Sequence, residues 1–432
     1  MIHENPLKYL VKEGCFALTG SDPFVLKACM KYAKTQNSYF ICEATVNQVN
    51  QFGGYTGMKP KDYAKLVLSI AREIKFPENK IILSGDHLGP FIWKHLDSGT
   101  AMEYSKELVR EYVAAGFRKI HLDPTMPLAD DDPETFGNDI IAKRAAELAI
   151  ISEQTYEATK NNTPWTYRPV YVIGSEVPVP GGTEEEEGIR VTAPEDLTAS
   201  IECFRNAFLS AHLPQVFEDT VAVVAQIGIE FSDEAVHEYN HEAALQLSKE
   251  LRKYPALRFE SHSSDYQTPQ CLYHMVKDGV GILKVGPETT FQLREGLFAL
   301  ADLETELAPM FHLKPSHFKE VLERVMVSHP EHWEKYYHGT PEQLAFKRRY
   351  SYSDRSRYYL AQPEVAEAAN ALLNNLSCVQ IPLPVLSQYF PVHYEKIRNG
   401  KLSNDPFAIL EDKVQSVIER YYQSLLRAKT SS

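Results

Sequence analysis

Short runs of apolar residues alternate with segments of helical periodicity along most of the chain. The runs are rich in branched side chains and end abruptly on small or polar residues, which is typical of strands buried on both faces. We predict strands at 15–20, 39–45, 81–87, 119–123, 168–176, 221–226, 257–262 and 281–287. Helices with one apolar face are predicted between them, at 24–34, 62–74, 108–113, 143–156, 197–211 and 241–253. Eight strands that alternate with helices over roughly 290 residues match an α/β fold, the (β/α)8 TIM barrel.

The alternation ends after about residue 307, where the pattern becomes purely helical. Helices are predicted at 318–326, 363–376 and 406–426, joined by aromatic-rich connections. We therefore expect a barrel domain at 1–307 that carries the site, and a C-terminal helical extension at 308–432 packed on it. A doubly wound open sheet is the rival fold. The sequence contains neither GxGxxG nor GxxxxGK[ST], so a nucleotide-binding sheet or a kinase with a phosphate loop has little support.

Composition narrows the choice of partners. The formal net charge of -13 repels nucleic acid and anionic membranes, so neither is an expected partner and a small molecule is favoured. The chain has no apolar run long enough to span a membrane, and its first residues lack the pattern of a signal peptide. The six cysteines are scattered without CxxC spacing, which indicates reduced thiols. We expect a soluble, cytoplasmic protein.

Polar side chains at the predicted strand ends carry the chemical argument. Barrel geometry brings these ends together, so we expect the following residues to converge: Asp86, His87, Asp123, Glu176, Gln226, His262 and Lys284. Two imidazoles and a carboxylate form a common donor set for an open zinc-type site, which makes His87, Glu176 and His262 the predicted metal ligands. Gln226 is either a neutral fourth donor or a contact to a substrate hydroxyl. The alternative is a hydrogen-bonded polar cluster that closes the barrel, with Asp86 as a helix cap.

Further candidates lie beside these strand ends. Glu43 and Asn47 follow the second strand and either bind sugar hydroxyls or stabilise a loop. Asp265 and Gln267 follow His262 and are expected to orient a ligand or substrate. Lys284 either binds a substrate oxygen or phosphate or pairs with a barrel carboxylate. A basic cluster in this acidic protein is a candidate for phosphate capture: Lys347, Arg348, Arg349, Arg355 and Arg357.

Several segments resemble the Z-type subunit family of bacterial tagatose-1,6-bisphosphate aldolase. They are residues 43–57 (EATVNQVNQFGGYTG), 85–90 (GDHLGP), 176–182 (EVPVPGG), 261–268 (SHSSDYQT), 283–287 (LKVGP) and 350–359 (YSYSDRSRYY). The resemblance implies a barrel related to class II, metal-dependent ketose bisphosphate aldolases, in which an Asp-His pair like Asp86 and His87 supplies the acid/base and a zinc ligand. The class II ligands are all histidines, whereas here His87 and His262 have counterparts and Glu176 or Gln226 completes the sphere. The Z-type subunit is usually described as a non-catalytic stabiliser of a separate catalytic subunit, and related members resemble ketohexose 4-epimerases that interconvert fructose and tagatose.

The charged strand ends favour an active enzyme over a scaffold, because burying such groups costs several kcal/mol unless they are paired or metal-bound. We expect a metal-dependent ketohexose 4-epimerase that cleaves and re-forms the C3–C4 bond by retro-aldol chemistry. Asp86 would remove the C4 hydroxyl proton and Asp123 would return it from the other face. Zinc is the first choice of divalent ion, followed by manganese, cobalt or nickel. The expected partners are a ketohexose or its phosphate, a class II aldolase catalytic subunit in the alternative role, and a second copy of the chain.

Overall fold

A closed barrel of eight parallel strands forms the centre of the larger part of the chain. The computed structural model describes residues 4–174 and 189–431. Around the barrel the strands follow the order β1, β10, β9, β6, β5, β4, β3, β2. Their bounds are β1 Cys15–Thr19, β2 Phe40–Thr45, β3 Ile81–Leu88, β4 Lys119–Leu122, β5 Val170–Ile173, β6 Thr220–Val224, β9 Arg258–Ser261 and β10 Val280–Val285. All eight predicted strands are present, and the (β/α)8 barrel is confirmed.

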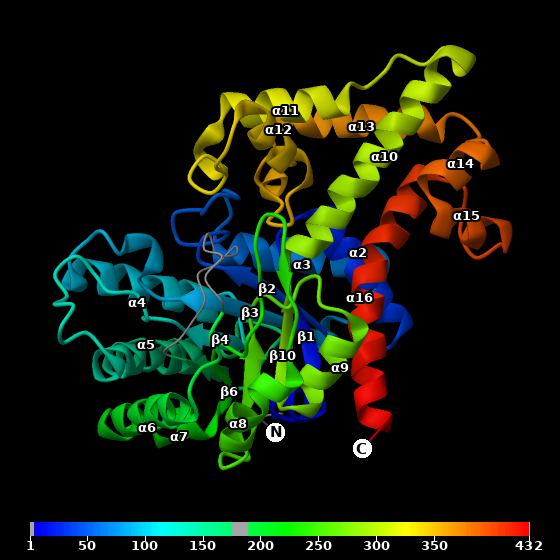
Figure 1. The fold of residues 1–432 in the computed structure, drawn as a ribbon. Coiled ribbons are helices and arrows are strands. Elements are labelled where there is room, and N and C mark those ends of the chain that lie inside the picture. Colours follow the sequence, from blue (N-terminus) through cyan, green and yellow to red (C-terminus); the bar gives the residue numbers. More distant parts are fainter. Residues whose placement is uncertain (1–3, 175–188, 432) are drawn as a thin grey trace. The chain divides into compact units, whose positions relative to one another are not determined.

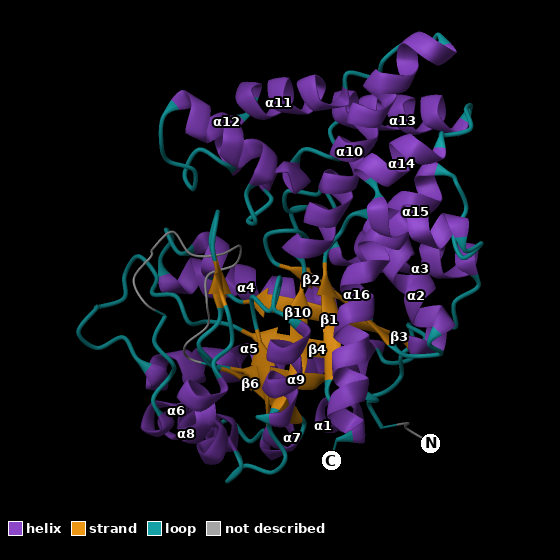
Figure 2. Ribbon diagram, turned by 45° about the vertical axis from the view of Figure 1, so that its right-hand side comes forward, coloured by secondary structure: helices purple, strands orange, loops and turns teal. Residues whose placement is uncertain are grey.

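Helices surround these strands (Figure 1; Figure 2). Those of the barrel are α1 Leu7–Glu13, α2 Pro23–Thr35, α3 Pro60–Ile74, α4 Ser98–Ala114, α5 Asn138–Thr159, α6 Pro194–Ser210, α7 Pro214–Glu218, α8 His241–Leu251 and α9 Pro269–Lys277. The predicted apolar faces are the buried ones: in α3, Tyr63, Val67 and Ile70 face the strands. A short hairpin of β7 (Glu230–Phe231) and β8 (Val236–His237) interrupts the alternation between β6 and α8.

The chain forms two compact units. The barrel unit comprises Met1–Glu230, Val236–Val285 and Tyr421–Ser432, and the helical unit comprises Phe231–Ala235 and Gly286–Arg420. Helices of the second unit are α10 Pro287–Phe311, α11 Phe318–Ser328, α12 Pro341–Tyr350, α13 Pro363–Ser377, α14 Leu383–Tyr389 and α15 Pro391–Arg398. A last helix, α16 (Pro406–Thr430), begins in the helical unit and ends in the barrel unit. The chain passes from one compact unit to the other after Glu230, Ala235, Val285 and Arg420. The boundary at residue 307 that the sequence suggests stays a prediction.

The interior of the barrel is layered. Apolar side chains fill its amino end, and α1 packs there against β6 and β10. This layer contains Leu7, Val11, Cys15, Ala17, Ile41, Ile82, Val170, Val172, Val221, Ala222, Val224 and Ile282. Charged residues replace apolar ones toward the carboxyl ends of the strands, which places the polar groups where active sites of this fold form. Among the described residues, no helix combines the length and apolarity that a bilayer crossing requires.

Candidate active site

Lys119 lies inside the barrel between two glutamates. Its Nζ is 2.7 Å from Oε2 of Glu43 on β2 and 2.6 Å from Oε2 of Glu260 on β9. All three side chains are fully buried. Strand register explains part of this contact, because Ser84 on β3 pairs with Glu43 on one side and with Lys119 on the other. The ammonium group therefore joins side chains from strands on opposite sides of the barrel.

A second lysine connects this layer to Asp86. Lys284 on β10 forms an ion pair with Oδ2 of Asp86, and its Nζ is 3.0 Å from Oε1 of Glu43. The same Nζ lies 3.2 Å from Nε2 of His262. Of the two roles that the sequence allows for Lys284, pairing with barrel carboxylates is the one seen.

Three imidazoles gather around the carboxylate of Asp86. Nδ1 of His121 is 2.7 Å from Oδ1 of Asp86, Nε2 of His87 is 3.3 Å from Oδ2, and Nε2 of His262 is 3.9 Å from Oδ1. The ring centroids are 4.9 Å apart for His87 and His262, 5.3 Å for His121 and His262, and 5.4 Å for His87 and His121. The structure thus brings together the two predicted histidine ligands and adds a third imidazole from β4.

Backbone irregularity aims His87 at this cluster. His87 has a φ of 52°, and the register of β3 with β4 shifts between Gly85 and Leu88. Such a bulge redirects a side chain at the end of a strand. Gly89 then passes so close to β4 that a Cβ there would lie 1.9 Å from the carbonyl oxygen of Asp123. A residue other than glycine would force the two strand ends apart.

Asp123 is the immediate partner of His87. Its Oδ2 is 2.6 Å from Nδ1 of His87, and its Oδ1 accepts a hydrogen bond of 2.5 Å from Oγ1 of Thr125. A carboxylate that binds one imidazole nitrogen fixes the ring orientation and leaves the other nitrogen for a ligand or substrate. The sequence identified both residues but not this contact.

Electrostatics keep the acids of the cluster ionised. Burial alone would raise the pKa of Asp86, but His87 and Lys284 outweigh it and hold that pKa well below its usual range. The pKa of Glu43 is lowered in the same way, with Lys119 and Lys284 overcoming the effect of burial. Burial and the neighbouring Lys284 push the pKa of His262 well below its ordinary value, so this imidazole is neutral.

The donor set fits a divalent cation. Two groups of donors have atoms within 4.8 Å of one another, Asp86, His121, Glu260 and His262 in one and His87, His121 and Asp123 in the other. The shared residue, His121, has a buried Nε2 that finds no hydrogen-bond partner among residues 4–174 and 189–431. Four buried carboxylates (Glu43, Asp86, Asp123, Glu260) face two buried ammonium groups (Lys119, Lys284), so the acids outnumber the lysines by two. A divalent ion would offset the negative charge of the acids.

The remaining predicted residues divide into three groups. Glu176 lies outside the described residues. Both amide atoms of Gln267 bond to backbone at Tyr239 and His237, and Oε1 of Gln226 accepts from the backbone of Gly228 and Ile229. Those two amides therefore stabilise loops. Asp265 is buried and Asn47 half-buried, and their part in a site stays a prediction.

Three residues of the charged cluster were not predicted, because the prediction considered only the residues at the end of each strand. They are Lys119, His121 and Glu260. Each lies two or four residues before a predicted site residue, Asp123 or His262. Side chains two apart on a strand face the same side, so the pattern KIHLD at 119–123 and the pair Glu260 and His262 contained the signal.

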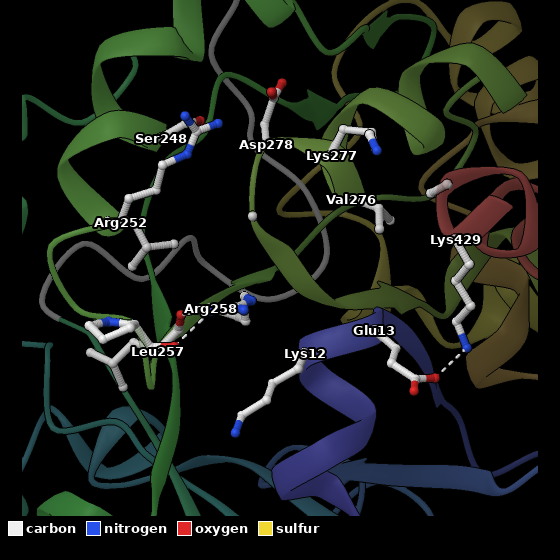
Figure 3. Close-up of a pocket in the computed structure, with 14 residues that line it drawn as sticks. Lys12, Glu13, Ser248, Arg252, Leu257, Arg258, Val276, Lys277, Asp278 and Lys429 are labelled. Carbon is white, nitrogen blue, oxygen red and sulfur yellow. Dashed lines mark hydrogen bonds and ion pairs between the residues drawn. The ribbon is translucent and has the colours of Figure 1, made fainter. Parts of the chain in front are cut away.

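A cavity of about 690 Å³ lies at the other end of the barrel. Its walls include the starts of β9 and β10 and the ends of α1, α8 and α9, with Arg252, Arg258 and Lys277 among the lining side chains (Figure 3). Glu13 and Lys429 pair across part of it at 2.8 Å. Since catalysis in this fold takes place at the carboxyl ends of the strands, the cavity is not the candidate active site.

The barrel and its charged cluster define the class, an aldolase-like TIM-barrel protein. The family model described as D-tagatose-1,6-bisphosphate aldolase subunit GatZ/KbaZ-like matches residues 7–425. This chain belongs to that family.

One solved structure agrees with this assignment, and two more distant ones are given after it for comparison of the fold alone. A crystal structure of a probable tagatose 6 phosphate kinase from Sinorhizobium meliloti 1021 is 38% identical, with a TM-score of 0.86, covering 95% of this chain and 100% of that chain. A fructose-bisphosphate aldolase from Campylobacter jejuni is 14% identical with a TM-score of 0.44, covering 86% of this chain and 90% of that one. The YdjI aldolase from Escherichia coli K12 is 10% identical with a TM-score of 0.41, covering 85% and 100% respectively. These last two are too distant to bear on function.

Proposed function

We propose that this protein is a metal-dependent ketohexose 4-epimerase of the tagatose and fructose type. One observation carries the proposal: three imidazoles with centroids 4.9 to 5.4 Å apart surround the carboxylate of Asp86 in a buried cluster where carboxylates outnumber lysines. A structural barrel core has no use for such a cluster, because unbalanced buried charge costs several kcal/mol.

The proposed ligands are the imidazoles of His87, His121 and His262. His121 replaces Glu176 in the set predicted from the sequence, and Glu176 stays a prediction as an additional ligand. A bound divalent ion, zinc first and manganese, cobalt or nickel next, would act as a Lewis acid toward the negative charge that develops on the ketose C2 oxygen.

The carboxylates and lysines of the chain supply the proton chemistry. Asp86 accepts the C4 hydroxyl proton, the C3–C4 bond breaks, and its electron pair stays on the three-carbon fragment that carries C1 to C3. The C4 aldehyde turns its other face, the bond re-forms, and the proton returns to the C4 oxygen. Lys284 holds Asp86 ionised and in place throughout. Asp123 orients His87, and its predicted role in returning the proton is retained in this proposal.

A second candidate function follows from the family description, which names an aldolase subunit. In that role the chain would stabilise a class II aldolase catalytic subunit without turnover of its own. A phosphate-loop kinase is a poor third choice, since the sequence lacks GxxxxGK[ST].

The test is conversion of fructose to tagatose by the purified full chain loaded in turn with zinc, manganese, cobalt and nickel, followed by ¹³C NMR. Fructose and tagatose phosphates form a parallel series. We expect interconversion with at least one ion and its loss in Asp86→Asn, while Glu134→Gln, the same change on an exposed loop residue, retains it. No turnover with any ion would refute the epimerase. Copurification with a class II aldolase whose lifetime rises on mixing would then establish the subunit role.

A further inference from the structure

A pair of arginines in the helical unit forms a second polar centre. Arg355 and Arg357 lie on the short 3-10 helix Arg355–Tyr358. Tyr336, Tyr358 and His332 are the aromatic neighbours. We call these five residues the arginine cluster.

Arg355 is a buried cation that pairs with no carboxylate of the described residues. Only 3% of the residue is exposed. Its guanidinium donates from Nη1 to the carbonyl of His332 at 3.2 Å and lies 3.1 Å above the ring of Tyr336, while Nε has no hydrogen-bond partner in the described part of the chain. No carboxylate within the described residues comes within ion-pairing distance of it. The adjacent Asp354 is turned away, accepting from Thr290 at 2.6 Å and pairing with Arg294 at 3.4 Å.

The other cations of the predicted basic cluster behave differently. Lys347 pairs with Asp233 at 3.0 Å, and Arg348 pairs with Glu323 at 2.5 Å. Arg349 lies 3.8 Å from Glu323 and is exposed. The predicted basic cluster therefore divides in two. Lys347, Arg348 and Arg349 contact carboxylates of the helical unit, whereas Arg355 contacts no carboxylate of the described residues.

The contact with the ring of Tyr336 does not offset the free-energy cost of burying the Arg355 cation. A cation over a ring contributes roughly 2 kcal/mol when desolvated. Leaving a buried charge without an opposite charge costs several kcal/mol. Burial accordingly lowers the pKa of the Arg355 guanidinium. Stable burial of this cation calls for an anion beside it.

A second cation, Arg357, lies close enough to Arg355 to add to the positive potential there. Arg357 is half-buried, lies 4.6 Å over the ring of Tyr358 and donates to its hydroxyl at 3.1 Å. The ring of His332 stacks on the ring of Tyr358, with 4.9 Å between the two centroids. Although burial would raise the pKa of Tyr358, Arg357 and Arg355 lower it, which shows that the potential at this hydroxyl stabilises negative charge.

We propose that the arginine cluster binds the phosphoryl group of a phosphate monoester, with Arg355 and Arg357 as the cationic donors. Planar guanidinium groups suit phosphate oxygens because each can donate two parallel hydrogen bonds. Phosphoryl binding goes beyond the proposed epimerase chemistry, and only the expectation that the ester is a ketohexose phosphate rests on that proposed function.

The experiment is isothermal titration of the full chain with inorganic phosphate, fructose 6-phosphate and fructose. We expect both phosphates to bind, and Arg355→Gln to weaken them by about tenfold or more, the loss typical of a charge-assisted pair. Arg349→Gln removes the same charge from an exposed helix position and should bind as the wild type does. Tighter binding of fructose 6-phosphate than of phosphate would identify the ester as the ligand, and equal binding would identify the free ion.

Three outcomes would overturn the proposal. They are absence of binding by the wild type at millimolar phosphate, undiminished binding by Arg355→Gln, and an equal loss in Arg349→Gln. Should Arg355→Gln lose its native circular dichroism, Arg357→Gln provides the same comparison from a half-buried position. Turnover is read separately: a chain that epimerises fructose but ignores phosphate refutes only the arginine cluster, and one that binds phosphate without turnover refutes only the epimerase.

Discussion

The Nδ1 atom of His87 lies 2.6 Å from Oδ2 of Asp123, and both side chains are buried at the carboxyl end of the barrel. Because this contact occupies one nitrogen, the ring presents Nε2 to the cluster around Asp86. The two residues come from neighbouring strands whose register is broken by the bulge at His87. The contact therefore converts an irregularity of the backbone into a defined orientation of a proposed metal ligand.

Replacing Asp123 by Asn should weaken metal binding while leaving the barrel folded. Loss of a carboxylate that orients a ligating histidine typically lowers metal affinity about 10- to 100-fold. Competition with a metal-indicator dye measures the change, and circular dichroism checks the fold. Glu134→Gln is the matched control on the following loop. Wild-type affinity in Asp123→Asn would mean that His87 does not depend on this contact or does not bind the ion.

Lys119→Met should destabilise the barrel strongly. The substitution leaves Glu43 and Glu260 facing each other without the ammonium that separates them, and removal of one partner from a buried ion pair costs about 3–5 kcal/mol. Urea denaturation gives the free energy of unfolding. The double variant Lys119→Met with Glu260→Gln removes one of the two carboxylate charges that lose Lys119 as a partner and should recover part of the loss. An unchanged unfolding free energy in the single variant would show that the two acids take up protons at little cost.

The strands of the barrel followed from the sequence because most of them lie in short runs rich in apolar residues that end on a polar residue. Runs such as 81–87 leave little room for another assignment, and β3 spans Ile81–Leu88. Helices α9 and α10 were not predicted, since each opens with a proline, Pro269 or Pro287, directly after a segment that was assigned to a loop or a strand end.

Only some residues of the candidate site could be predicted from the sequence. Asp86, His87, Asp123, His262 and Lys284 stand at strand ends and converge as predicted. Lys119 and Glu260 stand deeper, at positions where a buried apolar side chain is the usual occupant, and only the closed barrel shows that they neutralise each other. Contacts across a barrel depend on strand order and stagger together, and neither is written in a single strand.

Removing the metal should lower the melting temperature of the full chain. A ligand that binds only the folded state stabilises it in proportion to the logarithm of its concentration over Kd. Here the ion would also offset the negative charge of the buried carboxylates, which outnumber the lysines of the cluster by two. Chelation followed by re-addition of zinc, monitored by calorimetry, should show a reversible shift. His121→Ala should abolish the shift, and His95→Ala, on an exposed loop, should retain it. A melting temperature indifferent to chelator and zinc in the wild type would argue against a metal site.

Mild acid should destabilise the chain through His393. Burial lowers its pKa to about 4, with Lys413 and Lys396 adding to the effect and Asp412 opposing it. In the unfolded chain this imidazole titrates near its ordinary value of 6.5, so between pH 6.5 and 4 the unfolded state binds a proton that the folded state does not. Stability is therefore complete above pH 6.5, falls as the pH drops toward 4, and levels off below it. The full loss is about 3–4 kcal/mol, from the pKa difference at about 1.4 kcal/mol per unit. His393→Phe keeps the packing against Phe390 and cannot titrate. Urea denaturation gives the unfolding free energy of both proteins. The value for the wild type minus the value for His393→Phe should fall as the pH drops from 6.5 to 4. A difference that stays constant from pH 7 to 4 would show that His393 titrates alike in both states.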